Sequence, residues 1–112
     1  MNMLSEAWLD IGALEDVPRQ GARVLKTAKG CVAVFRAADN HVFALDDRCP
    51  HKGGPLSEGI VHGHSVTCPL HNWVFDMNSG EAQGADSGSV GTYLVKVDQG
   101  RILIDATHLS RG

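Results

Sequence analysis

The sequence predicts an all-β fold, and two observations favour this class over a helical one. Short runs rich in valine, isoleucine and phenylalanine alternate with turn residues along the chain of 112 residues. No long segment repeats its apolar residues with a helical period. A chain of this length is expected to build one core, so we predict a single domain over residues 1–112.

The first two expected strands lie around AWLDI (7–11) and ARVLKTA (22–28). The segment LEDVPRQG (14–21) separates them. It has room for a short helical turn, and the sequence leaves its conformation open.

A hairpin is predicted next. CVAVFR (31–36) and HVFAL (41–45) are rich in valine and phenylalanine, and Asp39-Asn40 between them suits a tight turn. Cys31 begins the first of these runs and has no other cysteine or histidine close by in sequence. Because buried thiols often pack as small apolar groups, we expect Cys31 in the core.

A second hairpin is predicted near the end. Apolar residues alternate along a strand from Tyr93 to Val97, and Asp98-Gln99-Gly100 provides a turn. In the following RILID (101–105), Ile102 and Ile104 are expected to share one face.

The middle of the chain, residues 46–92, is rich in glycine and proline and predicts loops, which often carry function. Within it, GIVHGHSVT (59–67) predicts a small hairpin around His62-Gly63-His64. The other two histidines outside the motif described below are His41 and His108. We interpret all four of these histidines as scattered surface residues.

Composition excludes several classes of function. A net charge of -3 gives no basic surface for nucleic acid. The longest apolar run is far shorter than a membrane span, and the first residues have no basic segment of the kind that precedes a signal sequence. We therefore expect a cytoplasmic protein, with no membrane and no nucleic acid among its partners. With three cysteines and no export signal, metal or redox chemistry is favoured over disulfides.

Two mixed pairs of cysteine and histidine carry the strongest functional signal. Cys49 and His51 lie in CPHKGG, and Cys68 and His71 lie in CPLH, with the predicted small hairpin between them. That hairpin would bring the two pairs to one site. A structural zinc site is one interpretation, although zinc modules usually place cysteine with cysteine and histidine with histidine. The other is a [2Fe–2S] cluster with two thiolates on one iron and two imidazoles on the other.

The residues around the pairs resemble the two Rieske cluster loops. The first loop has the form C-x-H-x-G-x-x-L, from Cys49 to Leu56, and the second has the form C-x-x-H-x-x-x-F, from Cys68 to Phe75. The resemblance implies a Rieske-type antiparallel β-sandwich, with a cluster-binding subdomain at about 46–80. It also implies one [2Fe–2S] cluster per chain, with Cys49 and Cys68 on the inner iron and His51 and His71 on the outer iron.

Residues that are absent from the two loops indicate which type of Rieske protein to expect. Neither loop has the extra cysteine of the high-potential respiratory proteins, and the serine and tyrosine that donate hydrogen bonds to their clusters are also missing. We therefore expect a potential near the bottom of the Rieske range, at about −150 mV. The chain also has no room for the mononuclear iron domain of Rieske oxygenases, so electron transfer without catalysis of its own is expected.

The stretch VFALDDRCPHKGGPLSEGIVHGHSVTCPLHNWVFDMNSGEA (42–82) resembles the small subunit of assimilatory NAD(P)H-dependent nitrite reductase. That resemblance implies a large flavin and sirohaem subunit as partner, which reduces nitrite to ammonia. Rieske ferredoxins of aromatic-ring dioxygenases share both loops and are the alternative. For them the partners would be a ferredoxin reductase and a terminal oxygenase.

Two further expectations concern the surroundings of the cluster. Residues beside the ligands could form a docking patch or simply be solvated or packed; they are Pro50, Lys52, Leu70 and Trp73. Many Rieske proteins have a proline in the loop that covers the cluster, whereas the segment GADSGSVG (84–91) contains none, which leaves its shielding role open.

Overall fold

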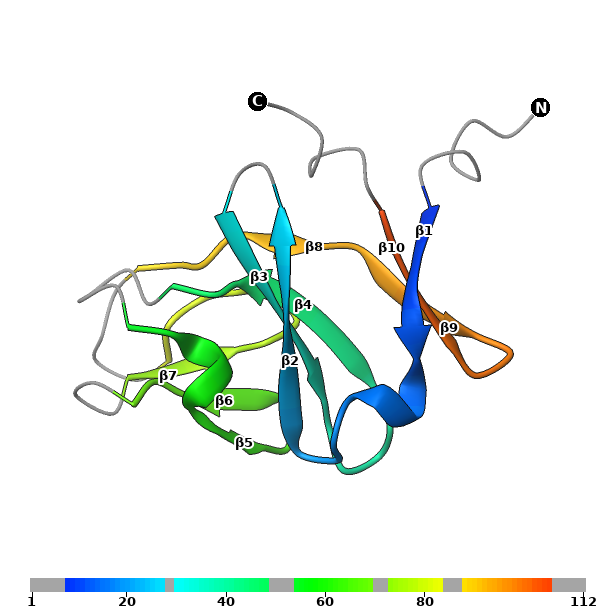
Figure 1. Cartoon of the computed structure of the whole chain (residues 1–112). Coiled ribbons are helices and arrows are strands. Elements are labelled where there is room, and N and C mark those ends of the chain that lie inside the picture. Colours follow the sequence, from blue (N-terminus) through cyan, green and yellow to red (C-terminus); the bar gives the residue numbers. More distant parts are fainter. Residues whose placement is uncertain (1–7, 28–29, 49–53, 70–72, 84–87, 106–112) are drawn as a thin grey trace.

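The computed structural model describes residues 8–27, 30–48, 54–69, 73–83 and 88–105, and these ranges form three antiparallel sheets (Figure 1). The first sheet has the order β1-β10-β9. Its strands are β1 (Trp8–Ala13), β9 (Val95–Asp98) and β10 (Arg101–Asp105). The four-stranded sheet has the order β2-β3-β4-β8. Its strands are β2 (Gly21–Thr27), β3 (Gly30–Arg36), β4 (Val42–Asp46) and β8 (Thr92–Tyr93).

The third sheet, β5-β6-β7, is the smallest. Its strands are β5 (Ile60–His62), β6 (Ser65–Thr67) and β7 (Val74–Asp76). The helical content of the described ranges consists of two single 3₁₀ turns, η2 (Leu14–Asp16) and η3 (Leu56–Glu58). No helix among these residues is long and apolar enough to cross a membrane. The all-β prediction is confirmed.

The two N-terminal strands are confirmed, and the open segment between them contains η2. The Asp16 carboxylate accepts a hydrogen bond from the N–H of Ala13 at 3.0 Å, which closes this turn at its start. Val17 donates its N–H to the carbonyl of Leu14, and Pro18 follows directly. Because proline does not continue a helix at this point, the element ends after one turn.

The predicted turns are confirmed by their backbone angles. Asn40 in the β3–β4 turn has φ 73°, and Gln99 and Gly100 between β9 and β10 have φ 52° and 78°. Asparagine and glycine tolerate this left-handed region best, which is why these residues mark the turns. The strand expected from Tyr93 to Val97 is interrupted at Leu94. Tyr93 pairs with β4, whereas Val95 begins the pairing with β10.

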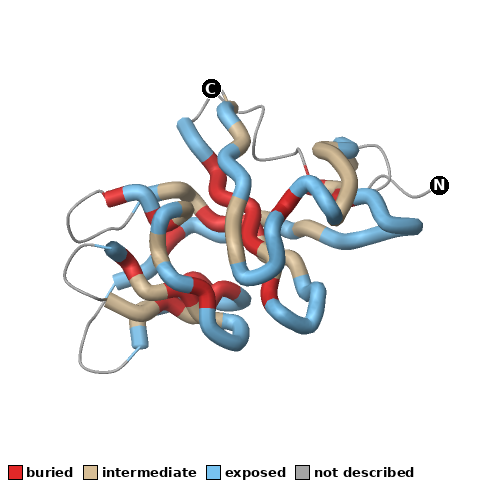
Figure 2. Tube along the Cα trace, turned by 60° about the horizontal axis from the view of Figure 1, so that its bottom comes forward, coloured by how far each residue is buried: buried red, intermediate tan, exposed pale blue. Residues whose placement is uncertain are grey.

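The four-stranded sheet lies between the other two sheets (Figure 1), and the buried residues gather in the interior of the fold (Figure 2). β3 is buried on both faces. Ala33 and Phe35 pack into a cluster shared with the β5-β6-β7 sheet. Val32 and Val34 point the other way, into a cluster shared with β10. Successive side chains of a strand alternate between faces, so burial on both sides explains the unbroken apolar run in this segment.

The prediction for Cys31 is wrong. Cys31 lies on the same face of β3 as Ala33, but it pairs with Lys26, next to the last pair of the β2–β3 hairpin, Thr27 with Gly30, and it is exposed. The core does not extend that far along the strand. Ile102 and Ile104, in contrast, share the buried face of β10 as predicted.

Candidate metal centre

The predicted ligands differ in what the structure says of them. Cys49, His51 and His71 lie outside the described residues. Cys68 is described: it follows β6 directly and is fully buried, with a relative exposure of 0%. The next residue, Pro69, is exposed, so the chain leaves the core immediately after the Cys68 thiol.

The first ligand loop is closed by a carboxylate. The Asp47 carboxylate, one residue after β4, accepts a hydrogen bond from the Ser57 N–H at 2.7 Å and another from the Ser57 hydroxyl at 2.8 Å. Both groups are partly buried, and such charge-assisted bonds are stronger than neutral ones. Since Asp47 and Ser57 flank the segment that contains Cys49 and His51, their contact fixes where this loop begins and ends.

The second ligand loop is closed by backbone. The Cys68 N–H donates to the carbonyl of Trp73 at 2.6 Å, and Thr67 pairs with Val74 in the adjoining strands. The Trp73 ring packs against the core and lies 6.2 Å from the Phe75 ring, measured between centroids. The described residues on either side of the segment that contains His71 are thus paired as adjacent antiparallel strands.

The two loops are held together by a shared core and a close backbone approach. Leu56, Cys68 and Phe75 all belong to one buried cluster. Gly59 follows η3 and lies so near β6 that a Cβ on it would come within 2.1 Å of the Thr67 carbonyl oxygen. Only glycine fits there without a shift of backbone, so the end of the first loop is packed directly on the strand that leads to Cys68.

These observations fit an iron–sulfur cluster. A thiol that is buried at the base of a fixed loop suits an inner-iron ligand, because the thiolate would be shielded from solvent and its charge neutralised by iron. Gly54, near the far end of the first loop, is also buried, so a backbone position without a side chain lies inside the fold there.

Comparison with known proteins agrees with this geometry. The model of the Rieske-like [2Fe-2S] domain matches residues 7–105. The chain belongs to the Rieske [2Fe–2S] family. It is therefore an electron-transfer protein that uses a Rieske cluster, and the cofactor and the Rieske-type fold predicted from the sequence are confirmed. Such a cluster takes up and releases one electron at a time.

Individual relatives fall into two groups. The ferredoxin component of the naphthalene 1,2-dioxygenase system of Pseudomonas aeruginosa is 31% identical over 103 residues, which cover 91% of this chain and 98% of that protein. The solved ferredoxin of carbazole 1,9a-dioxygenase from Nocardioides aromaticivorans is 26% identical, with a TM-score of 0.77 over 88% of this chain and 96% of that one. A solved Mycobacterium tuberculosis protein, described as an NADH-dependent nitrite reductase small subunit, is 27% identical, with the same TM-score over 87% and 92%.

The surroundings of the Rieske site are partly described. Trp73 is half-buried against the core, which favours packing over docking for this residue. The other three residues of the expected docking patch lie outside the described ranges; they are Pro50, Lys52 and Leu70. Residues 84–87 of the possible shielding segment also lie outside the described ranges. In the rest of that segment, Val90 is buried and donates its N–H to the carbonyl of Gly80 at 2.7 Å.

A partly buried hydrogen bond supports the strand that leads into the first Rieske loop. The Tyr93 hydroxyl on β8 donates to the Asp46 carboxylate at the end of β4, at 2.5 Å. Burial, with the hydrogen bond and negative charge of Asp46, raises the pKa of Tyr93 to about 12. This contact ties β8 to β4 three residues before the first Rieske loop begins at Cys49.

The interpretation of the remaining histidines as scattered is wrong for two of them. His41 and His64 lie side by side, with ring centroids 4.8 Å apart, and both reach the carboxylate of Asp39. The His64 hydrogen bond, aided by the His41 backbone N–H, holds the pKa of the Asp39 carboxyl well below its usual range. His62 is exposed on β5, as predicted, and His108 lies outside the described residues.

Proposed function

We propose that Cys49 and Cys68 bind the inner iron of the Rieske cluster and that His51 and His71 bind the outer iron. The full burial of Cys68 at the base of its loop supports the inner position. The closure of both loops, by Asp47 with Ser57 and by the backbone of Cys68, supports a common site for the two pairs. In this arrangement the imidazoles face solvent and are the route by which the electron leaves.

We further propose that the chain is the electron-transferring small subunit of an NAD(P)H-dependent nitrite reductase, with a flavin and sirohaem large subunit as its partner. The observation that carries this is the sequence of the two loops, CPHKGGPL and CPLHNW, on a Rieske fold. The 27% identity to the Mycobacterium tuberculosis structure, over 92% of that chain, gives further support.

A second candidate is a ferredoxin that carries electrons from a reductase to a ring-hydroxylating dioxygenase. The observation that favours it is the match to the Pseudomonas aeruginosa ferredoxin component, which spans 98% of that protein at 31% identity. Both candidates use the same Rieske cluster and differ in the protein that accepts the electron.

The ligand assignment is tested on protein purified without oxygen. We expect about two irons and two sulfides per chain and a reduced electron paramagnetic resonance spectrum with the low average g of a Rieske cluster. His71→Cys should lower the reduction potential or lose the cluster, because a thiolate adds negative charge to it. His62→Ala is the matched control and should change neither. Stoichiometric zinc in place of iron, or equal damage from the two substitutions, would overturn the assignment.

The partner is tested by reconstitution. The large sirohaem subunit from the same genome is assayed for nitrite-dependent NAD(P)H oxidation with no added small subunit, with the wild-type chain, and with His71→Cys. We expect activity to rise only with the wild-type chain. If the wild-type chain instead supports product formation by a ferredoxin reductase and terminal oxygenase from the same genome, and adds nothing to nitrite reduction, the ferredoxin function replaces the first proposal.

A further inference from the structure

A cluster of one carboxylate and two imidazoles lies outside the Rieske site, where two turns of different sheets meet. Asp39 and His41 belong to the turn between β3 and β4, and His64 belongs to the turn between β5 and β6. The Asp39 Oδ2 atom lies 3.0 Å from His41 Nδ1 and 2.9 Å from His64 Nε2. Three potential ligand atoms, separated by at most 4.8 Å, therefore converge on one point.

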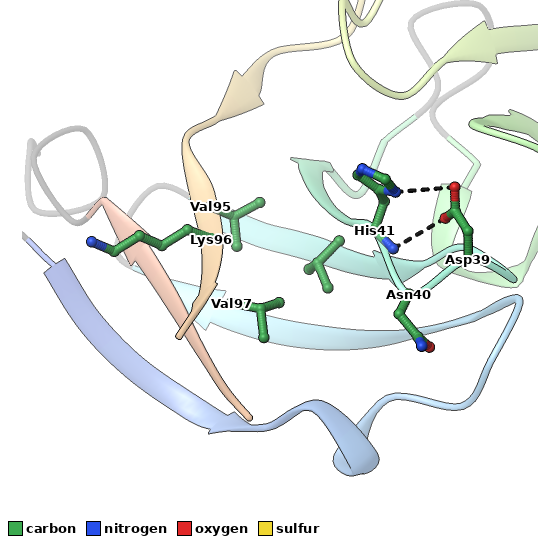
Figure 3. Close-up of a pocket in the computed structure, with 7 residues that line it drawn as sticks. Asp39, Asn40, His41, Val95, Lys96 and Val97 are labelled. Carbon is green, nitrogen blue, oxygen red and sulfur yellow. Dashed lines mark hydrogen bonds and ion pairs between the residues drawn. The ribbon is translucent and has the colours of Figure 1, made fainter. Parts of the chain in front are cut away.

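The backbone holds the two turns in place. The Asp39 Oδ1 atom accepts the His41 backbone N–H at 3.1 Å, which orients the carboxylate (Figure 3). Across the first turn, Ala37 and His41 are joined by a backbone hydrogen bond of 2.8 Å. In the second turn, the carbonyl of His64 accepts the N–H of Met77 at 2.8 Å. Hydrogen bonds in or beside both turns therefore help to hold the three side chains in position.

An aromatic side chain supports both imidazoles. The Phe43 ring packs on the core, lies 6.4 Å from the His41 ring in a stacked arrangement, and lies 5.0 Å from the tilted His64 ring, measured between centroids. The side chain of Asn40 points away from the cluster (Figure 3). Its Oδ1 atom accepts hydrogen bonds from two nitrogens of the Arg36 guanidinium, at 2.9 and 3.0 Å. Arg36 also donates to the carbonyl of Val17, so this cation is directed toward η2.

The geometry is close to that of a metal site. In tetrahedral zinc centres the ligand atoms lie 2.0–2.1 Å from the ion, so neighbouring ligand atoms are about 3.3 Å apart. The distances from Asp39 Oδ2 to His41 Nδ1 and to His64 Nε2, 3.0 and 2.9 Å, are already slightly shorter than this separation. The two imidazole nitrogens are the pair of ligand atoms that would have to approach each other. Each neutral imidazole can carry its proton on the other ring nitrogen, which frees the converging nitrogen for an ion.

We propose that Asp39, His41 and His64 form a second metal site, for a zinc-class divalent cation, that joins the β3–β4 turn to the β5–β6 turn. The donor set of two imidazoles and one carboxylate favours zinc over hard cations such as Mg²⁺, which prefer oxygen ligands only. Iron(II) uses the same donors, but zinc binds a given nitrogen and oxygen site more tightly.

The expected role of the ion is structural. The three side chains are 43 to 64% exposed, and the adjoining pocket of about 250 Å³ is lined by Asp39 and His41 but not by His64. A second pocket, of about 390 Å³, is lined by His41 but by neither Asp39 nor His64. Neither of these two pockets gathers all three side chains around one space, which favours a structural role. The ion would cross-link the four-stranded sheet to the sheet that carries Cys68, and its binding would stabilise the folded state by mass action.

The test uses the cluster-loaded protein, titrated with Zn²⁺ against a chromophoric chelator, with bound zinc and retained iron measured after dialysis. We expect about one zinc per chain without loss of iron. Asp39→Asn and His64→Ala should each weaken binding about tenfold or more, since the first replaces the carboxylate by a neutral amide and the second removes an imidazole. His62→Ala removes an exposed histidine of the same hairpin and should bind zinc as the wild type does, while Mg²⁺ should not compete.

A second measurement distinguishes a variant that binds zinc weakly because a ligand has changed from a variant that is poorly folded. At one fixed zinc concentration, zinc should raise the thermal unfolding midpoint of the wild type and of His62→Ala, and should raise that of Asp39→Asn clearly less. Asp39→Asn keeps the shape of the side chain, so this comparison holds even if His64→Ala is poorly folded. Zinc that binds equally well to Asp39→Asn, zinc that enters only as iron leaves, or an absence of zinc binding at micromolar concentrations would each overturn the proposal.

Discussion

The contact between Asp47 and Ser57 gives the sharpest test of how the first Rieske loop is held. Asp47→Ala removes two hydrogen bonds, of 2.7 and 2.8 Å, to a charged acceptor. Such bonds contribute about 1.5–3 kcal/mol each when buried, and partial exposure places this pair at the lower end, so we expect a loss of about 2–4 kcal/mol. For a domain of this size that lowers the thermal unfolding midpoint by roughly 10–15 °C.

The assay combines thermal unfolding with the rate of iron loss from the purified protein. Asp47→Ala should unfold earlier and lose iron faster, because the loop that contains Cys49 and His51 is no longer closed at its base. Ser57→Ala keeps the backbone N–H bond to Asp47, so its effect should be smaller, at about 1 kcal/mol. Glu58→Ala is the control, since it removes an exposed carboxylate from the same 3₁₀ turn. If Asp47→Ala behaves like Glu58→Ala in both measurements, the loop is not held by this contact.

Three other predictions follow from described contacts. Gly59→Ala should destabilise the fold by about 3 kcal/mol in urea unfolding, because its Cβ would meet the Thr67 carbonyl oxygen; near-wild-type stability would contradict the packing described. In ultraviolet titration Tyr93 should ionise near pH 12 rather than near pH 10. Since the unfolded chain releases this proton at the lower pH, the free energy of unfolding should fall between these two pH values. Tyr93→Phe should abolish this part of the pH dependence. Cys31 should react with iodoacetamide in the folded protein, and protection equal to that of a core thiol would contradict its exposure.

Elements defined by neighbouring residues could be predicted from the sequence. The hairpin turns at Asn40 and at Gln99-Gly100 depend on residues that accept a positive φ, and this preference is local. The interruption at Leu94 could not be predicted in this way. It arises because Tyr93 and Val95 pair with strands of different sheets, a choice made by tertiary packing. The exposure of Cys31 has the same origin, since only the assembled sheets determine where the core ends.

The Rieske motif and the proposed second metal site also differ in how far the sequence could predict them. The spacing of the Rieske motif from Cys49 to His71 is visible within one segment, so the sequence alone was enough to predict the cofactor. His41 and His64 are separated in sequence by the whole first Rieske loop and become neighbours only when the β5–β6 hairpin packs on β4. No short-range spacing marks such a pair, and a single exposed histidine in a turn gives no signal of a ligand role.

The positions of these clusters explain why both matter for the Rieske subdomain. The β5–β6 hairpin has three residues in each strand, about 10 Å, so its two ends are close enough for motion at one to reach the other. At one end, Thr67 leads into Cys68 and is packed against Gly59. At the other end, His64 is bonded to Asp39 of the four-stranded sheet. Because the hairpin is held at both ends, we expect Cys68 to be held firmly at the end of β6, as the proposed role of its thiol on the inner iron requires.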